Sequence, residues 1–336
     1  MPLLEIQHLQ VSFGSIDALR GVNLKIHRGE IVGLVGESGS GKSATAQSIL
    51  RLIPDKPGIK MSGDIFFEGE NLCTKTSREM ELIRGRKIGM IFQDSNAALN
   101  PTMPIGDQLS EGVIKHLGIK KDFAFQKGVE TLFNLGINNP VERMKQYSHE
   151  LSGGIRQRIL LAMAIACDPD LLIADEPTTA LDVITQAQIL QLLKNLDMSI
   201  LFITHDLNLI SKISDRVYVM YAGRIVEHNS TERLFSKPMH PYTQSLLQSI
   251  PSLSLATDSP LKVIQGSPPS PHNIPSGCAF HPRCDSAMKI CSMCDPLQDT
   301  SLSFPCWKYH PHAQNQIREI DDINTDQPAL ETVQAR

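Results

Sequence analysis

Residues 36–43, Gly-Glu-Ser-Gly-Ser-Gly-Lys-Ser, constrain the fold of this chain more than any other stretch. They match the pattern G-x-x-x-x-G-K-S/T at every fixed position. A short apolar run, 31–35, precedes them, and a helix-like segment, 43–52, follows them. This is the order of strand, loop and helix in which the pattern binds a nucleoside triphosphate, whereas an ordinary glycine-rich turn does not require it. The sequence therefore predicts an α/β domain with a nucleotide site at this loop.

The residue types in the loop suit phosphate binding. Glycines let the backbone wrap closely around phosphates, so that successive N–H groups and the positive end of the following helix point at the β-phosphate. Lys42 is expected to reach the β- and γ-phosphate oxygens, and Ser43 is expected to bind Mg²⁺. The predicted nucleotide-binding residues here are Gly36, Ser38, Gly39, Ser40, Gly41, Lys42, Ser43 and Ala44.

Polar side chains follow three other apolar runs of the chain, 88–92, 171–174 and 199–204. The carboxyl ends of parallel strands meet at one edge of a sheet, so these side chains are expected near the nucleotide. Gln93 and Asp175 are predicted to serve Mg²⁺, Glu176 to orient or deprotonate the attacking water, and His205 to hold the γ-phosphate. The alternatives are a solvated turn for the two acids and a surface position for the histidine.

A second anion site is predicted at the start of a helix that runs from about residue 152 to Cys167. Ser152, Gly153 and Gly154 lie in its first turn, where free N–H groups face outward, and Gln157 follows them. One triphosphate needs only one loop, so this second site suggests two nucleotides shared between two chains. An ordinary capped helix start is the alternative.

The remaining segments predict how the chain is divided. Residues 3–13 and 18–27 read as antiparallel strands, the second centred on residues 24–26, and Phe13 is expected either to stack on adenine or to pack in the core. Helical periodicity between prolines predicts an inserted helical subdomain at about 94–160, and a further helix is expected at 186–196. We expect a nucleotide-binding domain at 1–232, an extension at 233–319 and a disordered tail at 320–336.

Length and composition are consistent with this division. A chain of 336 residues, 41% of them hydrophobic, can form one large domain and a smaller appendage. The net charge of −4 offers no general attraction to nucleic acid or anionic lipid. The first residues lack the basic start and apolar core of a secretory signal, and no apolar run reaches the roughly 18 residues that span a bilayer. The chain is therefore expected to be soluble and cytoplasmic.

With these motifs in one order, the first 230 or so residues resemble the ATP-binding subunit of an ATP-binding cassette (ABC) transporter. Residues 36–43 resemble the Walker A motif, 171–176 Walker B and 152–157 the signature motif, while Gln93, Asp182 and His205 resemble the Q-loop, D-loop and H-switch. The resemblance implies an α/β P-loop NTPase fold with an antiparallel β subdomain, the inserted helical subdomain and a small Cys-rich C-terminal extension. It also implies that ATP on Lys42 and Ser43 of one cassette is closed over by Ser152 and Gly154 of another.

The segments 237–247 and 274–284 resemble those of dipeptide and oligopeptide importers. This implies a subunit at the cytoplasmic face of the inner membrane that works with a sister ATPase, two permease chains and an extracytoplasmic peptide-binding protein. Residues 95–98 differ from the sequence that is commoner in that group. They lie where contacts with the permease chains are expected. The alternatives are import of a metal chelate, glutathione or an antimicrobial peptide, a soluble ABC ATPase acting on nucleic acid, and an inactive regulatory subunit.

Five of the seven cysteines lie in one short stretch near the C-terminus. Cys278, Cys284, Cys291 and Cys306 have the spacing C-x5-C-x6-C-x14-C among several prolines. Four thiolates on a stiff loop suit a 4Fe-4S cluster or a zinc ion. Zinc sites usually use C-x2-C pairs, of which Cys291 and Cys294 form the single example here, so the wider spacing favours the 4Fe-4S cluster, with Cys294 left over. Free or simply buried thiols are the third possibility.

Overall fold

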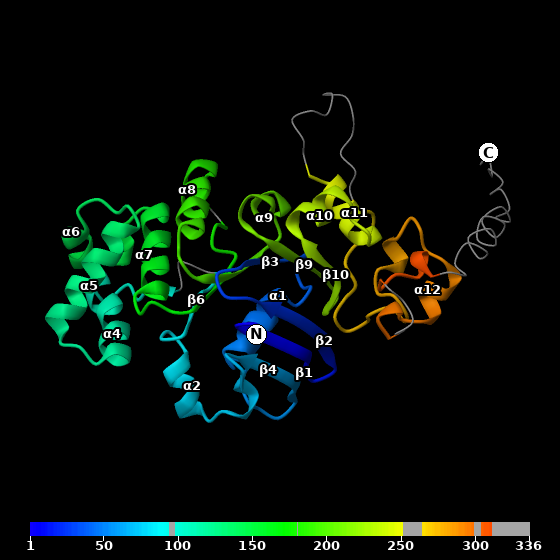
Figure 1. Cartoon of the computed structure of the whole chain (residues 1–336), viewed down its shortest axis with the longest axis horizontal. Helices are drawn as coiled ribbons and strands as arrows, with labels where there is room; N and C mark the ends of the chain where they lie inside the picture. Colours follow the sequence, from blue (N-terminus) through cyan, green and yellow to red (C-terminus); the bar gives the residue numbers. More distant parts are fainter. Residues whose placement is uncertain (94–97, 180, 251–263, 299–303, 311–336) are drawn as a thin grey trace, which may run out of the picture. The chain divides into compact units, whose positions relative to one another are not determined.

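The computed structural model describes residues 1–93, 98–179, 181–250, 264–298 and 304–310 (Figure 1). The predicted disordered tail and most of the departing segment 95–98 lie outside these ranges. The chain divides into two compact units, Met1–Lys237 and Pro238–Arg336. Among the described helices none is both long and apolar enough to cross a membrane.

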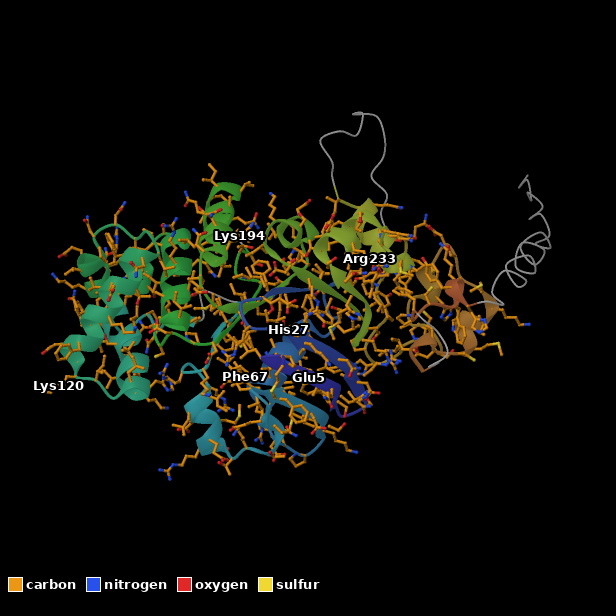
Figure 2. All side chains as sticks on the ribbon, in the orientation of Figure 1. Glu5, His27, Phe67, Lys120, Lys194 and Arg233 are labelled. Atoms are coloured by element: carbon orange, nitrogen blue, oxygen red, sulfur yellow. The ribbon has the colours of Figure 1, made fainter. Side chains whose placement is uncertain are left out.

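A four-stranded antiparallel sheet contributes many residues to the core of the first unit. Its strands lie in the order β2-β1-β4-β5, with bounds β1 Leu4–Phe13, β2 Ile16–Ile26, β4 Ile59–Phe67 and β5 Glu70–Asn71. Alternating residues of β1 face opposite sides: Leu4 and Ile6 are buried, whereas Glu5 between them reaches Lys25 across the pair at 2.9 Å. Figure 2 shows Glu5 and, on neighbouring β4, the buried Phe67. The predicted antiparallel pairing of the first two strands is confirmed.

A second sheet of six strands has the order β10-β9-β3-β8-β7-β6. All neighbours from β9 to β6 are parallel, and β10 pairs with β9 antiparallel at the edge. The three central strands are buried along their whole length, as expected where both faces of a parallel sheet are covered. The bounds are β3 Ile31–Val35, β6 Ile88–Ile91, β7 Leu171–Asp175, β8 Ser199–Thr204, β9 Arg216–Tyr221 and β10 Arg224–Ser230.

Helices of the first unit fall into two groups (Figure 1). In the first group α4, α5 and α6 pack on one another, and α4 and α5 also pack on α7. Their bounds are α4 Ile105–Leu117, α5 Lys121–Asn134, α6 Pro140–Lys145 and α7 Gly153–Ile165. The others are α1 Lys42–Ile49, α2 Ser77–Ile83, α8 Val183–Lys194, α9 Leu207–Ile213 and α10 Thr231–Ser236, with short 3₁₀ turns at Leu72–Thr74 and Ser148–Glu150.

The second unit is small and largely irregular. Its helices are α11 Pro241–Gln248 and α12 Lys289–Met293, with 3₁₀ turns at His281–Arg283, Pro296–Gln298 and Trp307–Tyr309. Met288, Cys291 and Trp307 form an apolar cluster, and Trp307 Nε1 donates to the carbonyl oxygen of Cys294 at 2.8 Å. Because these helices and turns are short, the shape of this unit depends on side-chain packing.

Candidate functional site

The glycine-rich loop joins β3 to α1, at the centre of the parallel sheet. Lys42 is 6% exposed, and its ammonium donates to the carbonyl oxygens of Gly36 at 2.8 Å and Glu37 at 2.9 Å. Gly41, at φ 108°, precedes the first residue of α1 and makes no side-chain cap, so the first N–H groups of the helix stay available. The loop thus presents a cation and free N–H donors, the two features that bind phosphate.

Burial sets the charge balance of this loop. It lowers the pKa of Lys42, and the nearby carboxylates of Glu176, Asp175 and Glu37 oppose that shift. Burial raises the pKa of Asp175, an effect that Glu176 increases, while a hydrogen bond from Ser43 opposes it. Asp175 is 3% exposed, and no described residue offers a hydrogen-bond partner to its Oδ1. A buried carboxylate oxygen without a donor, beside a serine hydroxyl, is the donor set that Mg²⁺ prefers.

The carboxylate of Glu176 lies just beyond the end of β7 and accepts hydrogen bonds from two donors. Gln93 Nε2 lies 3.1 Å and Thr179 Oγ1 3.0 Å from Oε2, and His205 Nδ1 is 3.2 Å from Oε1. Burial alone would raise the pKa of Glu176, but the contacts with His205 and Thr179 outweigh it and leave the pKa below its ordinary value. The structure therefore brings together Gln93, Glu176 and His205 from the ends of three strands.

Glu176 also has an unusual backbone conformation. Its φ of 49° is in the left-handed region, which costs a non-glycine residue free energy. Its N–H donates to the carbonyl oxygen of Ile203 in β8 at 2.9 Å, and its own carbonyl oxygen accepts from Thr179 N at 3.2 Å. These bonds hold the strained residue in place.

The signature residues lie at the start of α7. Ser152 is the N-cap, yet its hydroxyl makes no capping hydrogen bond. Gly154 lies so close to α8 that a Cβ there would be 2.8 Å from Cγ2 of Thr185. A cavity of about 280 Å³ opens beside these residues and includes Arg143 and Arg158 in its lining. Gln157 is buried at 4% exposure.

Two further predicted residues have clear structural contacts. Asp182 caps α8 by accepting from Ile184 N at 3.1 Å and Thr185 N at 3.0 Å, and these bonds lower its pKa. Phe13, at the end of β1, is partly buried against the core of the first unit. Neither observation excludes contact with a nucleotide, so both roles stay predictions.

The four cysteines of the predicted metal site are not placed as a ligand group. Within the described ranges, no three or more His, Cys, Asp and Glu side chains are arranged to hold a metal ion. Burial raises the pKa of Cys278 to about 12 and that of Cys306 to about 11, and it also raises the pKa values of Cys284 and Cys291. Without a metal, this burial favours the neutral thiols over the thiolates that a metal would bind. The geometry thus gives the predicted cluster no support.

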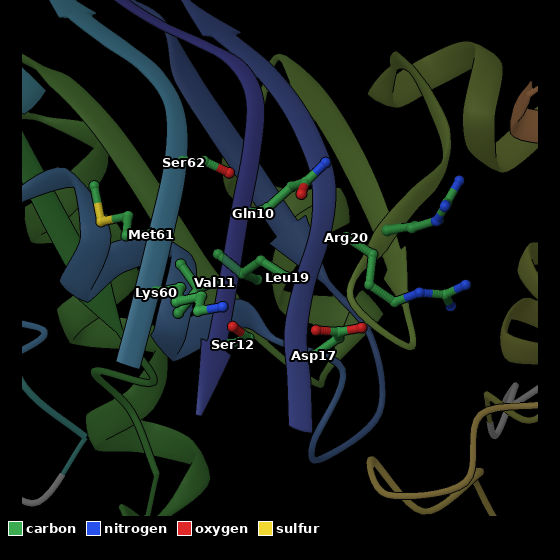
Figure 3. Close-up of a pocket in the computed structure, with 10 residues that line it drawn as sticks. Gln10, Val11, Ser12, Asp17, Leu19, Arg20, Lys60, Met61 and Ser62 are labelled. Carbon is green, nitrogen blue, oxygen red and sulfur yellow. The ribbon is translucent and has the colours of Figure 1, made fainter. Parts of the chain in front are cut away.

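A groove of about 610 Å³ crosses β1, β2 and β4 (Figure 3). Gln10, Ser12, Lys60 and Ser62 are among the ten side chains that line it. None of those ten belongs to the glycine-rich loop or to the strand ends described above. Leu19, which is one of the ten, nevertheless lies close to Gly41 of that loop, at 2.8 Å from the position of a Cβ there.

Sequence reasoning missed Thr179. Its hydroxyl contacts Glu176 because the turn after β7 brings the residue three positions later back beside the carboxylate. A Pro-Thr-Thr sequence after two acids was the available signal, since hydroxyl side chains in turns often bond nearby acceptors.

Comparisons with known proteins agree with this geometry. A family model described as ABC transporter matches residues 19–179, and one described as the C-terminal region of oligopeptide/dipeptide transporters matches residues 226–291. The oligopeptide transport ATP-binding protein OppD of Bacillus subtilis is 48% identical over 93% of this chain and 90% of its own length. The dipeptide transport ATP-binding protein DppD of the same organism is 44% identical over 95% of this chain and 98% of its own length.

Solved structures show the same fold. A dimeric, post-hydrolysis ATP-binding cassette bound to ADP and phosphate has a TM-score of 0.61 and 28% identity, covering 68% of this chain and 98% of that one. A CbiO1 structure from Clostridium perfringens has a TM-score of 0.61 and 26% identity, covering 70% of this chain and 91% of that one.

The fold and the strand-end site thus define an ABC-type ATPase with an α/β P-loop fold. Within that class, the chain belongs to the family of ATP-binding subunits that carry the oligopeptide/dipeptide transporter C-terminal region.

Proposed function

We propose that this chain binds and hydrolyses ATP to drive import of dipeptides or oligopeptides, working at the cytoplasmic face of the membrane. The observation that carries the ATPase part is the Glu176 carboxylate held between Gln93, Thr179 and His205, on the same edge of the sheet as Lys42. The peptide part is supported by the family match at residues 226–291 and by relatives named for peptide transport.

Each predicted residue has a proposed role in binding or hydrolysing ATP. Lys42 and His205 hold the γ-phosphate, and Glu176 accepts a proton from the attacking water. The lowered pKa of Glu176 keeps it ionised at neutral pH, as a base must be. Gly36, Ser38, Gly39, Ser40, Gly41 and Ala44 bind the phosphates through their backbone, Phe13 faces the adenine, and Ser152, Gly153, Gly154, Gln157 and Asp182 serve the site shared with the second cassette.

Mg²⁺ fits the buried pair of Ser43 and Asp175. The Oδ1 atom of Asp175 has no hydrogen-bond partner among the described residues, and the Ser43 hydroxyl lies beside that carboxylate. Gln93 is the third proposed contact. A bound magnesium ion supplies charge neutralisation for the phosphate oxygens.

Replacing Glu176 by Gln tests the ATPase assignment. ATP binding is expected to persist while kcat falls by two orders of magnitude or more, because the amide cannot accept the proton. Glu130→Gln, at an exposed position of α5, is the matched control and should hydrolyse ATP at the wild-type rate. Near-normal turnover by Glu176→Gln would refute the assignment.

The proposed partners are a sister ATPase in a heterodimer, two permease chains and an extracytoplasmic peptide-binding protein. The ATPase chain does not touch the transported solute, so growth of a deletion strain on defined peptides is the direct test. Normal peptide-dependent growth would favour a metal chelate, glutathione or an antimicrobial peptide as the solute. ATPase activity stimulated by nucleic acid, without co-purification with membranes, would favour a soluble ABC ATPase instead.

We also propose that Cys278, Cys284, Cys291 and Cys306 take up a 4Fe-4S cluster, with zinc as the alternative. The thiols of Cys291, Cys306 and Cys284 are near enough to raise the pKa of Cys278 further, although burial is the larger cause. Iron, sulfide and zinc are measured after anaerobic purification of wild type and Cys278→Ser. About four irons and four sulfides per chain, lost in the variant, would support the cluster. One zinc would favour the alternative, and no metal would mean free thiols.

A further inference from the structure

The three groups around the Glu176 carboxylate differ in their other proposed tasks. Gln93 and Thr179 donate to Oε2, and His205 lies beside Oε1. Under the proposed function Gln93 turns to Mg²⁺ and His205 to the γ-phosphate once ATP is bound. Both would then leave the carboxylate that they contact in this structure. Thr179 has no such second task.

Thr179 is also attached to Glu176 through the backbone. Its N–H donates to the carbonyl oxygen of Glu176 at 3.2 Å, and its hydroxyl donates to the carboxylate of the same residue at 3.0 Å. The two bonds close a tight turn, so the hydroxyl moves together with the residue that it contacts. A contact of this kind persists when the surrounding loops rearrange.

Glu176 is thereby fixed at both ends. Its backbone has a φ of 49° and is tied to β8 through the bond from its N–H to Ile203 O. Its side chain is only 12% exposed, whereas that of His205 is 61% exposed and has room to move. Without the Thr179 hydroxyl, no donor to Oε2 among the described side chains would remain once Gln93 departs.

We propose that Thr179 is a positioning residue for ATP hydrolysis, whose hydroxyl holds Oε2 of Glu176 so that Oε1 stays directed at the attacking water. This inference rests on the proposed function, in which Glu176 is the base. Loss of the hydroxyl should therefore affect the chemical step more than ATP binding.

The test compares Thr179→Val, Thr179→Ser and Thr178→Val in the full chain, assembled with the subunits that co-purify with it. Thr179→Val keeps the shape but removes the donor, and kcat is expected to fall about 10- to 100-fold with KM for ATP changed less than about 2-fold. Thr179→Ser should restore kcat. Thr178→Val is the neighbouring control, because the Thr178 hydroxyl contacts Gln186.

The outcomes separate this inference from the proposed function. Glu176→Gln without activity, together with Thr179→Val at the wild-type kcat, would overturn only the role of Thr179. A lower kcat with an equally large change in KM, or no rescue by Thr179→Ser, would indicate a merely structural residue and would also overturn it. Wild-type turnover by Glu176→Gln would overturn both, since Thr179 acts through Glu176.

Discussion

Asp175, the carboxylate proposed to serve Mg²⁺, illustrates how a buried acid lowers stability when no cation neutralises it. It is 3% exposed, Oδ1 has no hydrogen-bond partner within the described residues, and burial raises its pKa. An acid whose pKa is higher in the folded state stabilises the fold below its unfolded pKa of 3.8, and that contribution is lost as pH rises through the folded value. At neutral pH the nucleotide-free protein therefore contains a buried charge without full compensation.

Asp175→Asn is accordingly expected to stabilise the nucleotide-free chain while abolishing Mg²⁺-dependent hydrolysis. Removing the buried charge should raise the free energy of unfolding at pH 7 by about 1 kcal/mol. Thermal unfolding without nucleotide and steady-state ATPase assays measure the two effects. Asp197→Asn, at an exposed position, should change neither. A less stable Asp175→Asn protein would contradict the electrostatic argument.

His240 makes the stability of the second unit depend on pH. It is 2% exposed, accepts a hydrogen bond from Tyr242 N at 3.1 Å as the cap of α11, and burial lowers its pKa to about 4. A group with a lowered pKa contributes stability that is present above its unfolded pKa of 6.5 and is lost as pH falls towards 4. The full loss is expected to be about 3 kcal/mol.

Fluorescence of Trp307, the single tryptophan of the chain, reports unfolding of this unit. Denaturant titrations between pH 7.5 and 4 should show the loss in wild type. In His240→Asn the cap acceptor remains but the titrating ring is absent, so the pH dependence over this range should become weaker. An unchanged slope in the variant would assign the effect to other groups.

At the scale of elements, neighbouring side chains as well as the backbone conformation limit which residues can replace the glycines of the glycine-rich loop. Gly39 and Gly41 both have positive φ, 78° and 108°. A Cβ on Gly41 would lie 2.8 Å from Leu19 Cδ2 and from Met220 Cε, whereas a Cβ on Gly39 would meet nothing within 4 Å. The two sites therefore share backbone strain but differ in steric contact.

Replacing each of these glycines by alanine separates the two costs. Gly39→Ala should lose about 1 kcal/mol through the left-handed backbone alone. Gly41→Ala should lose about 1–3 kcal/mol more, because the core beneath α1 must move to accept the methyl group. Denaturant midpoints of the nucleotide-free protein give the difference. Equal losses of stability in the two variants would mean that the core accommodates the methyl group of Gly41→Ala without a further loss of free energy.

The elements that carry the site were predictable because their patterns are strong. The apolar runs 31–35 and 199–204 coincide with β3 and β8 at both ends, and α4 lies within the predicted helical insert at about 94–160. No strand was predicted at β9 or β10, and the strand predicted within 18–27 was centred on residues 24–26. The true β2 is longer, with register shifts against β1 that break simple alternation. Thr179 escaped prediction because its role depends on a turn rather than on a periodic pattern.

At the scale of the whole molecule, the two predicted phosphate-binding elements of this chain do not line a common cavity. The phosphate loop follows β3, whereas Ser152 and Gly154 line a cavity with α6 and α8 that includes no residue of that loop. A site shared between two cassettes would give each of these elements a phosphate group to bind. A solved relative of the same fold is dimeric with ADP and phosphate bound.

This arrangement predicts association that depends on ATP. Glu176→Gln, which should bind ATP without hydrolysing it, is expected to form a stable pair with the proposed sister ATPase when ATP is added, as measured by sedimentation velocity. Adding Ser152→Glu should abolish the pair, because a carboxylate would face the triphosphate of the other cassette. The hydroxyl of Ser152 makes no capping bond, and an acidic residue suits a helix N-terminus, so α7 itself should remain intact.

Fluorescent ATP should still bind to the chain's own loop in the Ser152→Glu variant. The exposed Ser211→Glu is the control and should leave the pair unchanged. Pairing that survives Ser152→Glu would mean that the signature residues do not close over the nucleotide of the second cassette.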